Sequence, residues 1–151
     1  MTAILLVALV LLVLANGFFV AAEFALVRAR RSKMEQLEAE RARGAALAIK
    51  QIDRIDEYLA ACQLGITMAS IGIGFLGEPA IAELLEEPLG TVAGHGAAVA
   101  IAVVLAYLIA TSLHITVGEQ VPKIYSIVHA ETTARLSARP LHWFRVAFKP
   151  L

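Results

Sequence analysis

The hydrophobic positions of this chain gather in three long blocks that are separated by charged segments. Residues 2–27 are apolar except for Asn16 and Glu23, and two further apolar blocks cover about 58–77 and 97–121. An α-helix needs about 20 apolar residues to cross roughly 30 Å of hydrocarbon, and each block reaches that length. The pattern therefore predicts an all-α integral membrane protein with three transmembrane helices.

A cleavable signal peptide is the alternative interpretation of the first block. No basic residue precedes that block, and it is longer than the apolar core of about 7–15 residues that signal peptides carry. We therefore expect a first membrane span that is retained.

Charged segments on either side of these blocks predict amphipathic helices. Residues 32–57 alternate apolar and charged positions at helical spacing, with Ser32 and Glu35 placed as a capping box and Gly44 as a division between two inner helices. Residues 129–149 combine Trp and Phe with Arg and Lys, which favours a juxtamembrane helix with an aromatic and a basic face.

The second block is unusually rich in small residues. Such residues let helices approach closely in lipid, so we expect this span in the middle of the bundle or at a dimer interface. Its packing or gating glycines are Gly65, Gly72, Gly74 and Gly77. The helix is expected to end at Gly77, before Pro79, and to be followed by a short external helix over 80–87 and a turn at 94–96.

The basic residues define a membrane topology. No Lys or Arg occurs between Arg54 and Lys123, and cytoplasmic loops are the ones that collect such residues. We expect a multi-pass protein of the plasma (inner) membrane, with its N-terminus outside and its C-terminus in the cytoplasm. The chain is 59% hydrophobic and 17% charged, with zero net charge, so nothing indicates a nucleic-acid partner.

Polar side chains inside the apolar blocks are the candidate chemistry. Placing the Glu23 carboxylate in hydrocarbon costs free energy, so a specific reason for it is expected. Either it is paired at the membrane interface, with Arg28 for example, or it is a cation ligand or gate. Asn16 lies on the same face of the helix. Ser70 either bonds its own helix or offers a hydroxyl oxygen. The strongest candidate is Glu119, because Pro122 interrupts the helix and frees carbonyl oxygens near Gly118.

Two apparent motifs do not support an enzyme. Residues 72–77 (GIGFLG) fit a dinucleotide-binding pattern, but they end a membrane span instead of joining a strand to a helix. His114 and Glu119 do not form a zinc-protease motif, and no nucleophile–base pair is present. His95, His129 and His142 are expected in loops or at the interface, and the single Cys62 reads as a packing residue.

Several segments in order resemble the CorC/cyclin M family of magnesium transporters. They are 16–26 (NGFFVAAEFAL) with 30–32 (RRS), 62–70 (CQLGITMAS), 77–79 (GEP), 118–123 (GEQVPK) and 140–144 (PLHWF). The resemblance implies a homodimer of three-span protomers with an inward-facing acidic cavity that binds Mg²⁺, and export driven by Na⁺ influx. One departure is that eukaryotic members have Ser and Asn where this chain has Val20 and Glu23.

In the full-length family, paired cystathionine-β-synthase-type domains follow and can bind ATP, and prokaryotic members add a small C-terminal domain. Neither is within these 151 residues, so we expect no ATP binding here. Mg²⁺ demands near-octahedral oxygens at about 2.0–2.1 Å, which the Ser70 hydroxyl, the Glu119 carboxylate and carbonyls near Gly118 suit. The alternative is a membrane anchor and dimerisation module whose activity lies in other domains.

Overall fold

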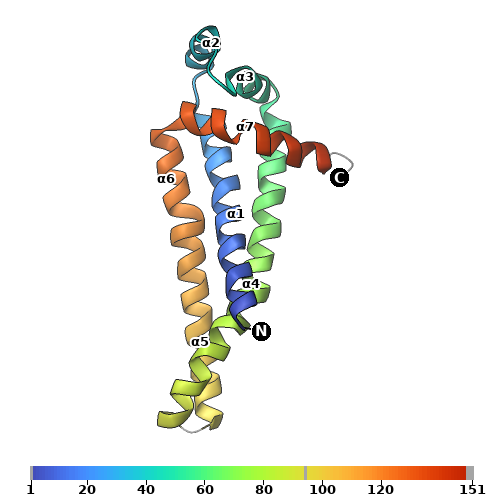
Figure 1. The fold of residues 1–151 in the computed structure, drawn as a ribbon. Coiled ribbons are helices and arrows are strands. Elements are labelled where there is room, and N and C mark those ends of the chain that lie inside the picture. The colour runs from blue at the N-terminus through green and yellow to red at the C-terminus, as the bar shows by residue number, and fades with distance from the viewer. Residues whose placement is uncertain (1, 94, 149–151) are drawn as a thin grey trace.

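The computed structural model describes residues 2–93 and 95–148, which are almost entirely helical (Figure 1). In chain order the helices are α1 (Thr2–Arg28), α2 (Arg31–Ala39), α3 (Ala45–Asp53), α4 (Ile55–Ala93), α5 (His95–Leu113), η1 (His114–Gln120), α6 (Val121–Val128) and α7 (Ala130–Ala147). These two described segments contain no strand, so the all-α prediction is confirmed.

Three long helical rods lie side by side: α1, α4, and the rod formed by α5, η1 and α6 in succession (Figure 1). Each contains a stretch long and apolar enough to cross a membrane, namely Thr2–Arg28, Ile55–Glu86 and Gly96–Val128. The prediction of three membrane-spanning helices is confirmed, and the chain is a multi-pass membrane protein. Of the expected turn at 94–96, Gly94 lies outside the described residues, whereas Gly96 is already within α5.

The second span is longer than expected. α4 runs through Pro79 and Pro88, so the predicted helix end at Gly77 and the separate helix over 80–87 are wrong. A proline removes a backbone hydrogen bond, but a helix continues with a bend where its neighbours hold it. Ile81, two residues after the first proline, is buried in an apolar cluster with side chains of α1 and α5. The lower part of α4 accordingly leans towards α5 in Figure 1.

The third rod contains a π-helical segment, η1, ahead of its proline. A π-helix pairs each amide with the carbonyl five residues earlier, and the Val121 amide donates to the Thr116 carbonyl in this way. Pro122 lies in the first turn of α6, where a missing amide costs little. The interruption expected at Pro122 therefore takes the form of a widened helical turn just before the proline. The rod then continues to Val128 instead of ending near residue 121.

At one end of the bundle, α2 and α3 form a hairpin beside α7 (Figure 1). Gly44 separates the two helices with a φ of 83°, a left-handed conformation that glycine adopts without strain, so the predicted division at Gly44 is confirmed. Gln51 is fully buried and donates from Nε2 to the Ala138 carbonyl at 2.7 Å. This bond joins α3 to α7.

The predicted capping box at Ser32 is wrong. α2 begins at Arg31, and no side chain caps its first turn. Arg31 instead pairs with Glu35 at 2.8 Å and with Asp53 at 2.9 Å, which ties the start of α2 to α3. The hydrogen bond with Asp53 is the main reason that the pKa of the Arg31 guanidinium lies above its usual value. The predicted inner range 32–57 therefore comprises α2, α3 and the first turn of α4.

α7 crosses the ends of the three rods (Figure 1) and corresponds to the helix predicted over 129–149, of which Lys149 lies outside the described residues. The Phe144 ring packs on Phe19 of α1, with ring centroids 4.6 Å apart. Trp143 is 74% exposed, so the expectation that Trp and Phe share one face is wrong for this pair. Adjacent residues of an α-helix point about 100° apart, which separates them.

Three of the four singled-out glycines of α4 face α1. A Cβ added to Gly65 would lie 2.6 Å from three atoms of the Phe19 ring, and one added to Gly72 or Gly77 would lie 2.9 Å from a leucine methyl of α1. A Cβ on Gly74 would meet nothing within 4 Å. Gly65, Gly72 and Gly77 therefore allow the close approach of α1 and α4, and Gly74 does not take part in it.

We predict that Gly65→Ala lowers the stability of the folded bundle by roughly 1–3 kcal/mol, because the added methyl overpacks the buried Phe19 ring. The matched variant Gly96→Ala, at a helical glycine where an added Cβ would meet nothing within 4 Å, is expected to unfold at the wild-type temperature. Thermal unfolding of both proteins in the same detergent measures the difference. Equal unfolding temperatures for the two variants would show that this close approach does not constrain the packing of α1 on α4.

Candidate functional site

A buried hydrogen bond joins α1 to the third rod at its π-helical segment. Asn16 is fully buried, and its Nδ2 donates to the Gly118 carbonyl at 2.9 Å. In an α-helix the donor to that carbonyl is the amide of residue 122, which is proline and has none. A side chain of α1 thus satisfies an oxygen that Pro122 leaves without its α-helical donor.

Glycine residues make room for this contact. A Cβ added to Gly118 would lie 3.2 Å from the His114 ring and 3.4 Å from Asn16 Nδ2, tighter than most side-chain contacts. A Cβ added to Gly17 would lie 3.1 Å from the ring of Pro122. Pro122, which offers no ligand atom on its side chain, therefore serves the site through its missing amide and its packing against α1.

Ser70 of α4 extends the network to the second rod. Its Oγ donates to Asn16 Oδ1 at 3.3 Å and lies 3.3 Å from His114 Nε2. The alternative interpretation, a hydroxyl bonded to its own helix, describes Thr67, which donates to the Gln63 carbonyl at 2.8 Å. The Ser70 hydroxyl can donate only one hydrogen bond. Because Ser70 donates that bond to Asn16 Oδ1, its oxygen accepts from His114 Nε2.

His114 links Ser70 to Glu119. Its Nε2 lies 3.4 Å from Glu119 Oε1, and the two side chains are 17% and 39% exposed. Residues five positions apart do not face each other on an α-helix, but the widened π turn brings them together. Sequence reasoning considered His114 only as part of a zinc motif and missed this role. The signal in the sequence was that His114 and Glu119 stand five positions apart, with Gly118 between them.

Four of the predicted site residues therefore meet in one place. Asn16, Ser70, Gly118 and Glu119 form a continuous polar chain through His114, and this chain connects all three membrane-spanning rods. Its oxygen atoms are a hydroxyl, a side-chain amide oxygen, a backbone carbonyl and a carboxylate. Oxygen donors of these kinds suit a hard cation such as Mg²⁺.

Glu23 lies apart from this network. It is two helical turns from Asn16 along α1, about 10 Å by helical rise, and its carboxylate interacts with the side chain of Gln63 on α4. Across residues 2–93 and 95–148, no cluster of three or more His, Cys, Asp or Glu side chains has the geometry of a metal site. Any cation at the Ser70–Glu119 network would therefore depend on neutral oxygens as well as on one carboxylate.

A hollow of about 120 Å³ lies beside the network. Ser70 and His114 line it at one end, and Gly74, Glu78 and Tyr107 line it towards the end of α4 that is remote from α7. This places a second carboxylate, Glu78, on the same hollow as Ser70. The predicted inward-facing cavity would instead lie on the α7 side and stays a prediction.

Comparison with known proteins assigns a family to this architecture. Residues 6–151 match the family described as the cyclin M transmembrane N-terminal domain. The chain belongs to the cyclin M family. The match covers the network, α7 and the three spans apart from residues 2–5 of the first, and it confirms the resemblance carried by the sequence motifs.

Curated relatives of this cyclin M domain are bacterial. The UPF0053 proteins YrkA and YhdT of Bacillus subtilis (strain 168) are 44% and 48% identical over 98% and 92% of this chain, covering 35% and 30% of their own lengths. The uncharacterized protein Rv1841c of Mycobacterium tuberculosis is 38% identical over 86% of this chain and 37% of its own. The cyclin M domain thus spans about a third of the curated relatives it matches.

We predict that Asn16→Leu destabilises the cyclin M domain by roughly 1–3 kcal/mol, because the similarly sized side chain leaves the buried Gly118 carbonyl without its donor. Thr67→Val is the control, since its exposed hydroxyl bonds only its own helix. Thermal unfolding in detergent measures both. Wild-type stability of Asn16→Leu would mean that the Gly118 carbonyl has another partner.

Proposed function

We propose that this domain transports Mg²⁺, binding the ion at the Ser70–Glu119 network and exporting it in exchange for Na⁺. The observation that supports the proposal is the partly buried polar network itself, which spans three apolar rods at an interruption of regular helix. Polar and ionisable groups are costly in hydrocarbon and mark ion pathways there. Interrupted helices whose carbonyls face a cavity are the usual cation sites of transporters.

Binding requires the network to rearrange. Mg²⁺ holds its oxygen ligands at about 2.0–2.1 Å. In the structure, His114 Nε2 lies between the two candidate ligands, 3.3 Å from Ser70 Oγ and 3.4 Å from Glu119 Oε1. The ion would take Glu119 from His114 and accept the Ser70 hydroxyl and the Gly118 or Asn16 oxygen as ligands. Water molecules complete the octahedron, because Mg²⁺ gives up its hydration reluctantly.

Glu23 has a separate place in this proposal. It lies about two turns nearer than Asn16 to the α7 end of α1, which the distribution of Lys and Arg predicts to be cytoplasmic. A carboxylate there attracts a cation on its way from the cytoplasm to the network. The N-terminus is then outside and the C-terminus is inside the plasma (inner) membrane.

The proposal includes a homodimer. Gly74 and Phe75 lie on an exposed face of α4, where Phe75 is 78% exposed and a Cβ on Gly74 would meet nothing within 4 Å. A glycine on an exposed apolar face allows a second transmembrane helix to approach closely. Such an approach would place a second copy beside the hollow that Ser70 and Gly74 line.

One observation favours a second candidate function, a membrane anchor and dimerisation module. The chain spans about a third of its curated relatives, so the activity of the whole protein can reside elsewhere. In such a module the polar network would hold the rods together without binding an ion. Mg²⁺ would then not stabilise the domain.

We predict that Glu119→Ala abolishes Mg²⁺ binding to the purified domain, because a dication in a low-dielectric site needs a compensating charge. Ser70→Ala is expected to weaken binding without abolishing it. Glu83→Gln, which removes an exposed carboxylate of α4 outside the network, is the control and should bind as the wild type does. Isothermal titration calorimetry with MgCl₂ measures all three. Wild-type affinity in Glu119→Ala would count decisively against this site.

A further inference from the structure

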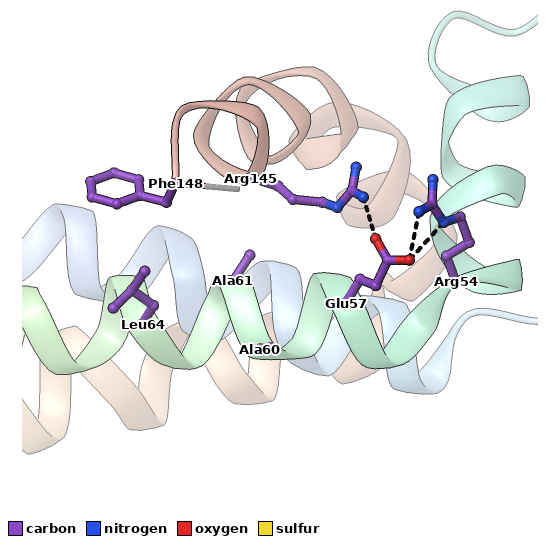
Figure 2. Close-up of a pocket in the computed structure, with 7 residues that line it drawn as sticks. All are labelled: Arg54, Glu57, Ala60, Ala61, Leu64, Arg145 and Phe148. Carbon is purple, nitrogen blue, oxygen red and sulfur yellow. Dashed lines mark hydrogen bonds and ion pairs between the residues drawn. The ribbon is translucent and has the colours of Figure 1, made fainter. Parts of the chain in front are cut away.

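A second cavity lies far from the polar network, between the first turns of α4 and the end of α7 (Figure 2). Its volume is about 530 Å³, within the roughly 300–1,000 Å³ of pockets that hold small organic ligands. Charged side chains line one end and apolar side chains the other. The proposed transport function uses none of them.

The charged end holds two guanidinium groups and one carboxylate. Glu57 accepts hydrogen bonds from Arg54 Nε at 2.9 Å and Nη2 at 2.6 Å, and its other oxygen pairs with Arg145 Nη2 (Figure 2). The formal charge of this group is +1. The remaining guanidinium N–H groups of both arginines form no hydrogen bond with other residues that the structure describes. They are available to an anion.

Arg145 is held in place for such a contact. Its side chain is only 13% exposed, and its guanidinium lies 5.0 Å from the centroid of the Tyr58 ring. Tyr58 in turn is fixed by a 2.8 Å hydrogen bond between its hydroxyl and His142 Nδ1. A positive charge positioned in this way loses little side-chain entropy when it binds an anion.

The apolar end follows directly along α4. Ala60, Ala61 and Leu64 occupy the next turns towards the middle of the span, and Phe148 covers them from the end of α7 (Figure 2). From Glu57 to Leu64 the helix rises about 10 Å. The cavity therefore passes from cationic to apolar at the start of the second membrane-spanning stretch, which is where a lipid headgroup gives way to its acyl chains.

We propose that this cavity binds an anionic phospholipid. The phosphate bridges Arg54 and Arg145, and an acyl chain lies along Ala60, Ala61 and Leu64 beneath Phe148. Charge complementarity selects the anionic headgroup, and the predicted cytoplasmic position of this end places the cavity in the leaflet that carries anionic lipids. A free phosphate would leave the apolar end empty, and a zwitterionic lipid would leave the +1 charge without compensation.

The test is lipid binding to the whole chain by native mass spectrometry, with phosphatidylglycerol and phosphatidylcholine of identical acyl chains and with glycerol 3-phosphate as the headgroup alone. We expect phosphatidylglycerol to bind about tenfold more tightly than phosphatidylcholine. Arg54→Gln and Arg145→Gln should each remove most of this preference. Arg54 is more than half exposed, so Arg54→Gln serves where Arg145→Gln does not fold.

Arg139→Gln is the matched control, because Arg139 is an exposed arginine of α7 outside the cavity, and it should keep the wild-type preference. Three results would overturn the proposal. The first is equal affinity for the two lipids, and the second is binding of glycerol 3-phosphate as tight as that of phosphatidylglycerol. The third is an equal loss of preference in Arg139→Gln and Arg54→Gln, which would indicate a diffuse basic surface and not this cavity.

Discussion

The hydrogen bond from Asn16 to the Gly118 carbonyl is the interaction on which the centre of this bundle depends. Pro122 has no amide to give that oxygen, and a buried carbonyl left without a donor costs roughly 1–3 kcal/mol. A buried asparagine on α1 meets the requirement and still has its own oxygen free to accept from Ser70. One backbone defect thus fixes the lateral position of α1 against the third rod and draws a polar residue of α4 to the same place.

Close packing makes this arrangement possible. Gly65, Gly72 and Gly77 bring α4 onto α1, and Gly17 admits the ring of Pro122 on another face of α1. The polar side chains concerned are short, so the contacts between Asn16, Ser70 and the π turn require rods at close range. Packing and chemistry are therefore linked. A bulkier residue in place of Gly65, Gly72 or Gly77 would push the rods apart and lengthen the hydrogen bonds of the polar network, although its own Cβ would meet apolar side chains first.

The three spans and most of the site were predictable from the sequence, because apolar length and polar residues in hydrocarbon are local signals. The ends of the helices were less predictable. α4 continues past Pro79 because Ile81 is buried by other rods, a tertiary effect that no local pattern contains. The pairing of His114 with Glu119 depends on a π turn. Glu23, on the same face of α1 as Asn16, stands apart because two turns of helix separate them.

Transport of a divalent cation by the oxygens gathered around this defect is the function that we propose. Its most direct test is Mg²⁺ flux into liposomes reconstituted with the chain, measured with and without an opposing Na⁺ gradient. We expect Mg²⁺ flux above that of empty liposomes, accelerated by the Na⁺ gradient. Flux no greater than that of empty liposomes under either condition would contradict it and would favour a network that only holds the membrane helices together.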